Sequence, residues 1–581
     1  MIAVEEDEEY EYMKSDLKSY LQQKSELLKQ QFISNCKSIK TEYKYYNDAD
    51  EKLLDEVFNI LKIRKFMYRA KKRVQNDPNA GLFNEAELFY QNIKETQCSD
   101  SSVDSFIVNQ ADLKVTPGSE HEKVFLPHVI KEYRINEEQK KKYRDYKITE
   151  IGIDQSEQLY ETPGQYCVFV SVVYKYKAER INTDGTIDVH TFNAYEPKEI
   201  LTHSLVTSGL LSYILVNKFC NYISLQKQEA IFATAGIRLL KGTMANWVVE
   251  TGKKLSVFMN KLMQYLRACP EINLGMAQLI VQESQKRCIS DLSVVAIVGD
   301  GGDPKKPKVL IYHRSKNQRL DYIEKILNDY KGAIQYDLCA GFENIRRRQN
   351  QLWAGSWAVI KRKFKEVKQI IKENKELISI LNYINELYKI ESKLRKKYKC
   401  ETKLNCDKES FINERKEITE SIFTKIKMVL MDVYKKADSN SLFGIAINFT
   451  LKAWDELTAY VMSPWLTPDN SIAEQALQPF TRARKNWYVS AVTETCASEQ
   501  IYSLIETAKI NDVDPYYYMR YLFDKLPETH DNELEKLFPW NVDIAGIVAQ
   551  YVREDALISL CAKNYKKRSL GTDYKITPVQ I

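Results

Sequence analysis

Apolar and polar residues follow several distinct patterns along the chain, and each pattern predicts a different kind of element. Residues 15–33 (SDLKSYLQQKSELLKQQFI) place leucines at helical spacing among Lys, Gln and Glu, which predicts a helix with one narrow apolar stripe. Such a helix either forms a short coiled coil or packs against its own domain. Residues 96–122 are polar and turn-rich (SDSSVDS, TPGSE), which indicates a linker after a helical N-terminal region, residues 1–95.

The pattern changes to β-rich and then returns to helical. Residues 123–204 are rich in β-branched and aromatic types, as in QYCVFVSVVYKYKAERI, and predict a small β unit. Residues 205–285 are expected to be helical, and within them LQKQEAIFATA and TMANWVVET flank Gly236 as two helices joined by a glycine turn. That layout is shared by a helix-turn-helix, which would bind DNA, and by an ordinary αα-hairpin.

Three short strands are expected next, followed by a long helical region. CISDLSVVAI (288–297) and KVLIYH (308–313) are typical of neighbouring strands, and GAIQYD ends a third strand at Asp337. The Lys-rich residues 346–440 (RRRQ, KRKFKEVK, SKLRKKYK) predict helices, and residues 496–581 predict further helices with a basic tail.

The composition is typical of a folded protein with several domains. Of the 581 residues, 44% are hydrophobic and 28% charged, and at roughly 100–200 residues per domain the chain holds about three to five units. Because the net charge is only +6, any prediction that the protein binds nucleic acid must rest on local basic patches. The longest apolar run (LVTSGLLSYILV) is too short for a membrane span of ~20 residues, and the acidic N-terminus (MIAVEEDEEYEY) does not resemble a secretory signal. Together with 11 cysteines but no C-x-x-C pair, this predicts a cytoplasmic protein with reduced thiols.

Three carboxylates in separate parts of the chain have the chemistry of a metal site. Asp291 lies in a predicted strand, Asp337 ends another, and Glu474 lies near the start of a predicted short helix. Carboxylate oxygens are the ligands that Mg²⁺ and Mn²⁺ prefer, and two such ions ~4 Å apart can catalyse phosphodiester chemistry. A plainer alternative holds for Glu474, because the spacing Ser471-x-x-Glu474 also fits a capping box that only stabilises the helix.

The residues that follow Glu474 are basic and aromatic. Arg binds phosphate through its planar fork and Lys as a point charge, while Trp can stack on an unpaired base. We therefore expect this stretch to contact DNA beside the carboxylates. The predicted contacts are Arg482, Arg484, Lys485 and Trp487.

Three segments form motifs in a fixed order. The region 210–248 is helical and ends in TMANWV, the stretch 469–487 begins with DN and ends with RKNW, and 501–515 reads IYSLIETAKINDVDP. In this order they resemble the insertion-sequence-66 transposase family, and the resemblance covers roughly residues 125–540. The residues that match in the second segment are Asp469, Asn470, Glu474, Pro479, Arg484, Lys485, Asn486 and Trp487.

The resemblance implies an α+β, multidomain protein with an RNase-H-like (α/β) catalytic core. That core would comprise residues 286–345 and 441–495, interrupted by the helical basic insertion 346–440. The implied activity is a DDE mechanism, in which carboxylates bound to Mg²⁺ or Mn²⁺ cleave DNA ends and then transfer strands. The implied metal-binding catalytic residues are Asp291, Asp337 and Glu474, and the further implied DNA contacts are Asn486, Arg362, Lys363, Thr243 and Trp247.

The same resemblance implies partners and a location. The partners are DNA, both element ends and target, a second copy of the chain on that DNA, and helper proteins of the same element, with no membrane. The working location is the cytoplasm, in association with the nucleoid. The region 205–285 would be the helix-turn-helix-like DNA-binding part.

The departures from the family matter as much as the matches. Between the strand of Asp291 and KVLIYH the chain has only the turn GDGGDPKKP, where the family has another strand, so one strand of the catalytic sheet is expected to be missing. Asp300 or Asp303 in that turn would then be substitutes for Asp291. The zinc-binding cysteines of many relatives are absent from the β unit apart from Cys167. The sequence leaves two hypotheses, an active transposase and a catalytically decayed relative that still binds DNA.

Overall fold

The computed structural model describes 11 segments of the chain. They are residues 128–162, 165–202, 204–283, 286–300, 307–316, 320–347, 351–371, 373–398, 407–437, 441–481 and 497–568. The predicted N-terminal helical region, its coiled-coil alternative, the linker 96–122 and the basic tail after residue 568 lie outside these segments.

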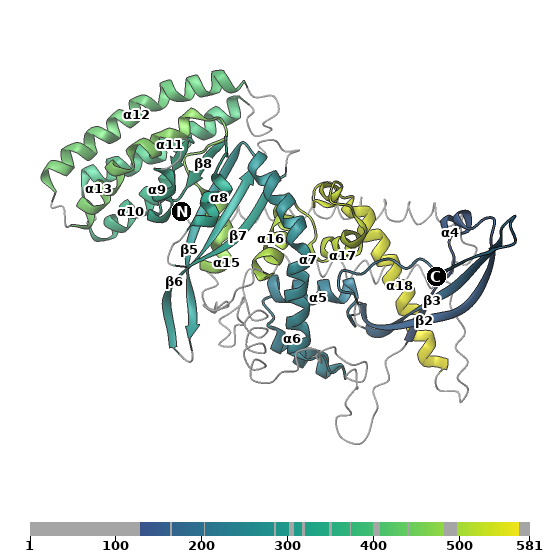
Figure 1. Ribbon diagram of the computed structural model, residues 1–581. Helices are drawn as coiled ribbons and strands as arrows, with labels where there is room; N and C mark the ends of the chain where they lie inside the picture. The colour runs from purple at the N-terminus through teal and green to yellow at the C-terminus, as the bar shows by residue number, and fades with distance from the viewer. Residues whose placement is uncertain are drawn as a thin grey trace.

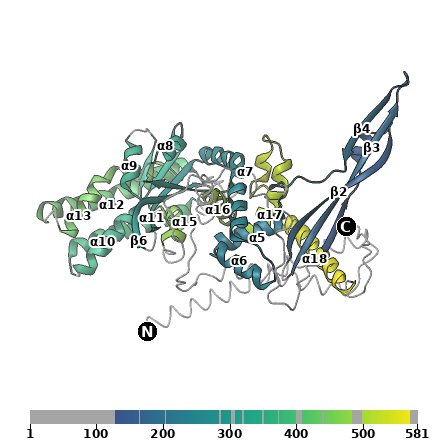
Figure 2. The same ribbon diagram turned by 60° about the horizontal axis from the view of Figure 1, so that its bottom comes forward.

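The β-rich region folds into a four-stranded sheet with long, projecting strands (Figure 2). β3 is the central strand, since it pairs in parallel with β1 and antiparallel with β2 and β4. This arrangement agrees with the small β unit that the sequence predicts. The elements are β1 (His128–Tyr133), α4 (Glu137–Lys142), β2 (Lys147–Thr162), β3 (Gln165–Ile181) and β4 (Ile187–Asn193).

Three helices follow, and the last of them is part of the main core. α5 (Ser208–Phe219) and α6 (Leu225–Thr234) lead to α7 (Lys241–Ala268), after a turn in which Gly236 has a φ of 76°. The apolar face of α7 is buried in the core, which favours an αα-hairpin over an exposed recognition helix. The expectation that residues 205–285 are helical throughout is wrong, because α7 ends at Ala268 and a strand follows directly.

That strand completes a five-stranded sheet with the order β7-β6-β5-β8-β9. β5, β6 and β7 are antiparallel neighbours, while β8 and β9 are added in parallel beside β5. The strand predicted at 288–297 is therefore the second strand of this sheet rather than the first, and the predicted loss of a strand is wrong. The elements are β5 (Glu271–Glu283), β6 (Lys286–Asp300), β7 (Val309–Lys316), α8 (Asp321–Leu327), β8 (Ala333–Tyr336), α9 (Ala340–Arg346) and β9 (Trp353–Gly355).

The Lys-rich insertion forms a helical unit with its own hydrophobic core. α13 and α14 share this core with α10, α11 and α12, so the helical unit continues past residue 440, where we expected the catalytic core to resume. In Figure 1 this unit lies at one end of the five-stranded sheet. The elements are α10 (Trp357–Ile370), α11 (Lys375–Lys397), α12 (Lys408–Lys436), α13 (Leu442–Lys452), α14 (Trp454–Ala459) and a 3₁₀ turn, η4 (Tyr460–Met462).

The last helices pack on the five-stranded sheet and along its edge strand β7, and they connect the sheet to the β unit. α15 packs on β5 and β6, α16 packs on β7, and α18 reaches β1 and β2 (Figure 1). The bounds are α15 (Ser471–Thr481), α16 (Ala497–Ile510), α17 (Pro515–Lys525), η5 (Leu526–Glu528), η6 (Leu534–Leu537) and α18 (Ile544–Arg568). None of the helices in the described segments combines the length and apolar character that crossing a bilayer requires.

Candidate carboxylate site

Asp337 lies directly after β8, at the edge of the five-stranded sheet. Because Tyr336 is in register with Leu274 of β5, Asp337 lies beside the next residues of that strand. The backbone N–H of Met276 donates to Asp337 Oδ2 at 3.2 Å. The other oxygen, Oδ1, is buried and has no hydrogen-bond partner among the described residues. One oxygen of this carboxylate is therefore held by the strand, and the backbone N–H groups of Asp337 and Cys339 also bond the carboxylate and lower its pKa.

Glu474 lies in the first turn of α15, and its charge acts on Asp337. Burial raises the pKa of Asp337 to about 6; the Met276 N–H opposes this rise, and the negative charge of Glu474 adds to it. Burial also raises the pKa of Glu474, while the charge of Arg362 lowers it and that of Asp469 raises it further. The charge of Glu474 therefore acts on Asp337, and a cation bound by both carboxylates would relieve that repulsion.

Asn470 fixes α15 against the sheet. This fully buried side chain donates from Nδ2 to the carbonyl oxygen of Leu274 at 2.8 Å, and its N–H donates to Ser356 Oγ at 3.2 Å. One turn later, the N–H of Glu474 donates to the carbonyl oxygen of Asn470 at 3.1 Å. The D-N pair that the sequence shows before the glutamate thus ties the helix to the strand beside Asp337.

Gly275 allows the helix to approach β5 closely. A Cβ atom at this position would lie 2.8 Å from Leu477 Cδ1 and 3.1 Å from Ala473 Cβ. Real Cβ atoms do not tolerate such a contact with a well-packed neighbour without displacing it. The residues of β5 nearest Asp337 are therefore a glycine and Met276, and neither carries a carboxylate.

The capping-box alternative for Glu474 is wrong. Ser471 is the first residue of α15 rather than the residue before it, and its N–H donates to Asp469 Oδ1 at 3.2 Å. The backbone group that a capping box would assign to Glu474 is thus bonded to another side chain. Glu474 is therefore free of that role.

The register between β5 and β6 does not place Asp291 next to Asp337. Ala296 of β6 pairs with Gly275, and Asp291 precedes Ala296 by five residues, which corresponds to ~16 Å along a strand. The side chain of Asp291 lies outside the described residues. Asp300 pairs with Glu271 near the opposite end of the strands, and Asp303 lies outside the described segments. Neither Asp291 nor Asp300 is thus a neighbour of Asp337 in the sheet.

The predicted DNA contacts differ in their surroundings. Arg362 is exposed on α10 and acts electrostatically on Glu474, and the Lys363 ammonium lies 4.5 Å from the centre of the Phe449 ring. Trp247 is only 7% exposed and packs in the main core. Thr243 is partly exposed on the same helix. The predicted contacts Arg482, Arg484, Lys485, Asn486 and Trp487 lie outside the described segments.

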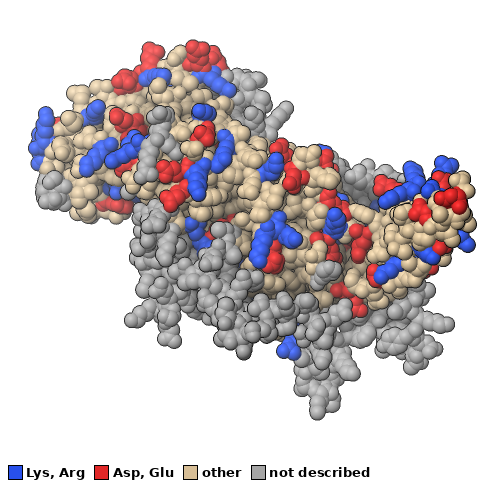
Figure 3. All heavy atoms as spheres, viewed as in Figure 1, with Lys and Arg blue, Asp and Glu red and all other residues tan. Residues whose placement is uncertain are grey.

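Basic side chains are not concentrated in one continuous patch on the face seen in Figure 3. Lys and Arg are spread over the helical insertion, and Asp and Glu are interspersed among them. Arg362, whose positive charge acts on Glu474, is therefore the residue that supports phosphate binding near the carboxylates.

The pair fits a divalent cation in its donor chemistry. Both ligands are carboxylates, the type preferred by Mg²⁺ and Mn²⁺, and one of their oxygens is buried without a partner among the described residues. No cluster of three or more His, Cys, Asp or Glu suited to a metal occurs in the described segments. Two protein ligands with further positions left to water and phosphate are typical of Mg²⁺ sites that bind phosphorylated substrates.

Comparison with known proteins yields a consistent set of matches. The Transposase IS66 family model matches residues 203–498, and a model of the IS66 C-terminal element matches residues 503–540. Among curated proteins, the uncharacterized protein y4jD of Sinorhizobium fredii is 24% identical over 358 residues, covering 59% of this chain and 68% of y4jD. The uncharacterized protein y4qI of the same organism is 23% identical over 404 residues, covering 67% of this chain and 71% of y4qI.

Proposed function

Because the chain belongs to the IS66 family of transposases, we propose that it cleaves and joins DNA at a divalent-metal site formed by Asp337 and Glu474. Two observations support the proposal. Asp337 directly follows β8, with its Oδ1 buried and without a hydrogen-bond partner among the described residues, and the charge of Glu474 acts on this carboxylate. The DNA substrates are the ends of a mobile element and a target, in the cytoplasm with the nucleoid.

The order of the strands supports an RNase-H-like core for this site. Three antiparallel strands, β7, β6 and β5, are extended by the parallel strands β8 and β9, and α15 packs against the sheet. This is the mixed sheet that the family resemblance leads one to expect. The helical insertion lies between the strand end of Asp337 and the helix of Glu474 in the sequence, and the charge of Glu474 nevertheless acts on Asp337.

Each residue has a role that follows from its position. Asp337 and Glu474 would hold the cation, which when bound supplies positive charge to the attacking and leaving oxygens of a phosphodiester. Arg362, exposed beside Glu474, would bind a phosphate oxygen of the DNA and orient the backbone. Asn470 keeps Glu474 opposite Asp337 by tying α15 to β5.

A strand-transfer assay tests the proposal. The full chain is incubated with Mg²⁺ or Mn²⁺ and DNA ends taken from the flanks of its gene, and it is compared with Asp337→Asn and Glu474→Gln. We expect product from the wild type and at least a roughly 100-fold loss in each variant, comparable to removal of a single electrostatic group in other enzymes. DNA affinity, measured by fluorescence anisotropy, should stay unchanged in both.

Asp291→Asn is the matched control, because the register places Asp291 away from the pair. It should leave product formation unchanged. DNA binding without product in the wild type would favour the alternative, a catalytically decayed relative that occupies DNA. Among the described residues no group of three or more His, Cys, Asp or Glu is suited to hold a metal, and this observation makes the outcome worth testing.

A further inference from the structure

Residues 463–470 connect the helical insertion to α15, and hydrogen bonds from side chains and from one backbone N–H hold them in place. On the side of the sheet, Gln335 Nε2 donates to the carbonyl oxygen of Thr467 at 2.6 Å. The backbone N–H of Trp357 donates to the carbonyl oxygen of Pro468 at 2.8 Å. Since Gln335 lies two residues before Asp337, the same contact links this segment to the strand that carries the first carboxylate.

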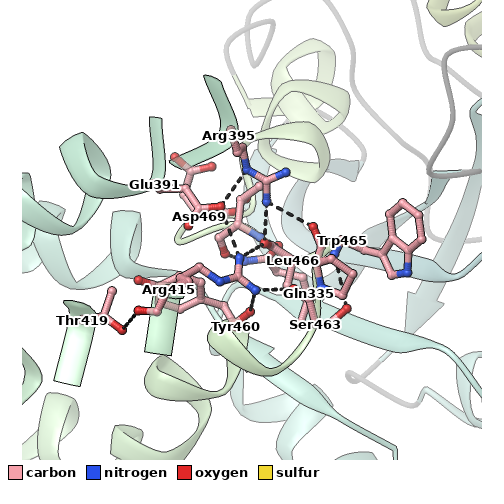
Figure 4. Close-up of polar contacts among 12 residues, drawn as sticks. Gln335, Glu391, Arg395, Arg415, Thr419, Tyr460, Ser463, Trp465, Leu466 and Asp469 are labelled. Atoms are coloured by element: carbon pink, nitrogen blue, oxygen red, sulfur yellow. Dashed lines mark hydrogen bonds and ion pairs between the residues drawn. The ribbon is translucent and has the colours of Figure 1, made fainter. Parts of the chain in front are cut away.

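On the other side, the guanidinium of Arg415 in α12 bonds three main-chain carbonyls (Figure 4). Its Nη2 donates to Tyr460 at 2.9 Å and to Ser463 at 2.5 Å, and its Nη1 donates to Leu466 at 3.2 Å. The side chain is fully buried. A guanidinium holds its five donors in a rigid plane, so it can fix several acceptors at once, whereas the ammonium of Lys is a single point charge.

A second arginine and a carboxylate complete the cluster in Figure 4. Arg395 of α11 donates to the Leu466 carbonyl oxygen at 2.8 Å, and its Nε donates to Glu391 Oε1 at 2.6 Å. The same Glu391 oxygen lies 3.3 Å from Arg415 Nη1. Glu391 therefore bridges the two like charges and allows both arginines to approach one carbonyl oxygen.

We propose that Arg415 and Arg395 are positioning residues for Glu474. They fix residues 463–470, and only one helical turn separates Asn470 from Glu474, so a displacement of this segment moves the Glu474 carboxylate relative to Asp337. Metal sites tolerate misplacement of about 0.5 Å or less. The helical insertion therefore sets the geometry of the cation site, an inference that rests on the proposed function of the carboxylate pair.

The test compares Arg415→Lys and Arg395→Lys with Arg520→Lys in the full chain. Arg520 is a matched control, since it is also buried and paired with a carboxylate, Asp555, but lies in α17. The readouts are Mn²⁺ affinity by electron paramagnetic resonance, hydrogen exchange of the α15 amides and the urea midpoint. We expect Mn²⁺ binding ~10–100-fold weaker in the Arg415 and Arg395 variants, the range seen when groups behind metal ligands are removed.

Exchange of the α15 amides should also become faster in the Arg415 and Arg395 variants and remain unchanged in Arg520→Lys. Equal Mn²⁺ affinity and equal exchange in all three variants would overturn the inference. If Arg415→Lys does not fold, Arg395→Lys, which is less buried, gives the same comparison. If the wild type binds no Mn²⁺, the proposed function fails, and the exchange of α15 alone decides whether the arginines position this helix.

Discussion

Arg415 and Arg520 are both buried arginines that pair with a carboxylate, yet the atoms they bond differ in kind. Arg520 bonds side chains: it lies 2.8 Å from Asp555 and also bonds the hydroxyl of Tyr160. Arg415 bonds main-chain carbonyls in the segment that leads to Glu474. The first arginine joins the β unit to α17 and α18, and the second holds a stretch of backbone beside the candidate site.

The difference matters because two paired side chains can be replaced together by mutation, whereas no mutation removes a main-chain carbonyl group. A buried ion pair between side chains can often be replaced by apolar residues at little cost, but a buried carbonyl that loses its donor stays unsatisfied. We therefore expect that apolar residues can replace the Arg520 ion pair at little cost in stability. The Arg415 cluster, in contrast, satisfies buried main-chain carbonyls and fixes the backbone.

Single substitutions should have the largest effects on stability. Arg415→Met and Arg520→Met should each lower the free energy of unfolding by about 3–5 kcal/mol, because each leaves buried partners without their cation. Urea unfolding followed by tryptophan fluorescence measures this. A loss below about 1 kcal/mol in either variant would show that the cluster adds little to stability.

Double substitutions should separate the two clusters. Arg520→Met with Asp555→Leu should recover a substantial part of the loss of Arg520→Met, since it removes the buried charge on both sides. Arg415→Met with Glu391→Leu should recover little, because the carbonyls of Tyr460, Ser463 and Leu466 stay unsatisfied. Similar recovery in both pairs, measured by the same unfolding experiment, would refute the distinction.

Asn470→Ala tests the contact between the supported segment and the sheet. It leaves the Leu274 carbonyl without its donor and should cost about 1–3 kcal/mol of stability. Asn511→Ala is the matched control, since Asn511 Nδ2 donates to the Lys308 carbonyl at 2.7 Å beside β7. Both variants should be less stable in urea, and only Asn470→Ala should weaken Mn²⁺ binding; an unchanged Mn²⁺ affinity would contradict the role of Asn470.

The smallest expected effect is a pH dependence of the free energy of unfolding, which we attribute to Glu199. Burial raises the pKa of Glu199 from 4.5 to about 7; the hydrogen bond from Gln158 opposes this rise, and the charges of Glu196 and Asp524 add to it. The native state therefore binds more protons, and the free energy of unfolding should fall as pH rises from about 4.5 to 7. Glu199→Gln should reduce this fall, as measured by urea unfolding at several pH values; an identical slope in the variant would contradict the assignment.

The sequence predicts much of this fold because several elements have strong local signals. The β-branched run of β3 and the apolar strands β6 and β7 are recognisable without tertiary information. The D-N pair and Glu474 also stand out in the sequence, and the structure adds that Asn470 bonds β5. The sequence predicts Asp337 and Glu474 as members of one site, and in the structure the charge of Glu474 contributes to the raised pKa of Asp337.

The central strand β5 is the element that local patterns did not identify. EINLGMAQLIVQE follows directly on the long helix α7, and Asn273, Gly275 and Gln278 interrupt its apolar run. Its parallel partner β8 lies about sixty residues later, so the pairing depends on long-range contacts. Pro270, just before the strand, is the local signal that marks the end of the helix. Because the sequence pattern does not reveal β5, it predicts the strand of Asp291 as the first of the sheet, and the resulting prediction of a missing strand is wrong.

The sequence alone also does not predict that Trp247 is buried. A tryptophan on a helix after a glycine turn fits either a DNA contact or a core position. Tertiary packing decides between them, because α7 lies among α16, α5 and the sheet.

The most direct test of the carboxylate site is a titration of the full chain with Mn²⁺, followed by electron paramagnetic resonance, for the wild type, Asp337→Asn, Glu474→Gln and Asp291→Asn. We predict one site whose affinity falls at least ~10-fold in Asp337→Asn and in Glu474→Gln and is unchanged in Asp291→Asn. Equal affinity in the wild type, Asp337→Asn and Glu474→Gln would contradict a cation site at this pair, and a loss confined to Asp291→Asn would place the metal on β6 instead.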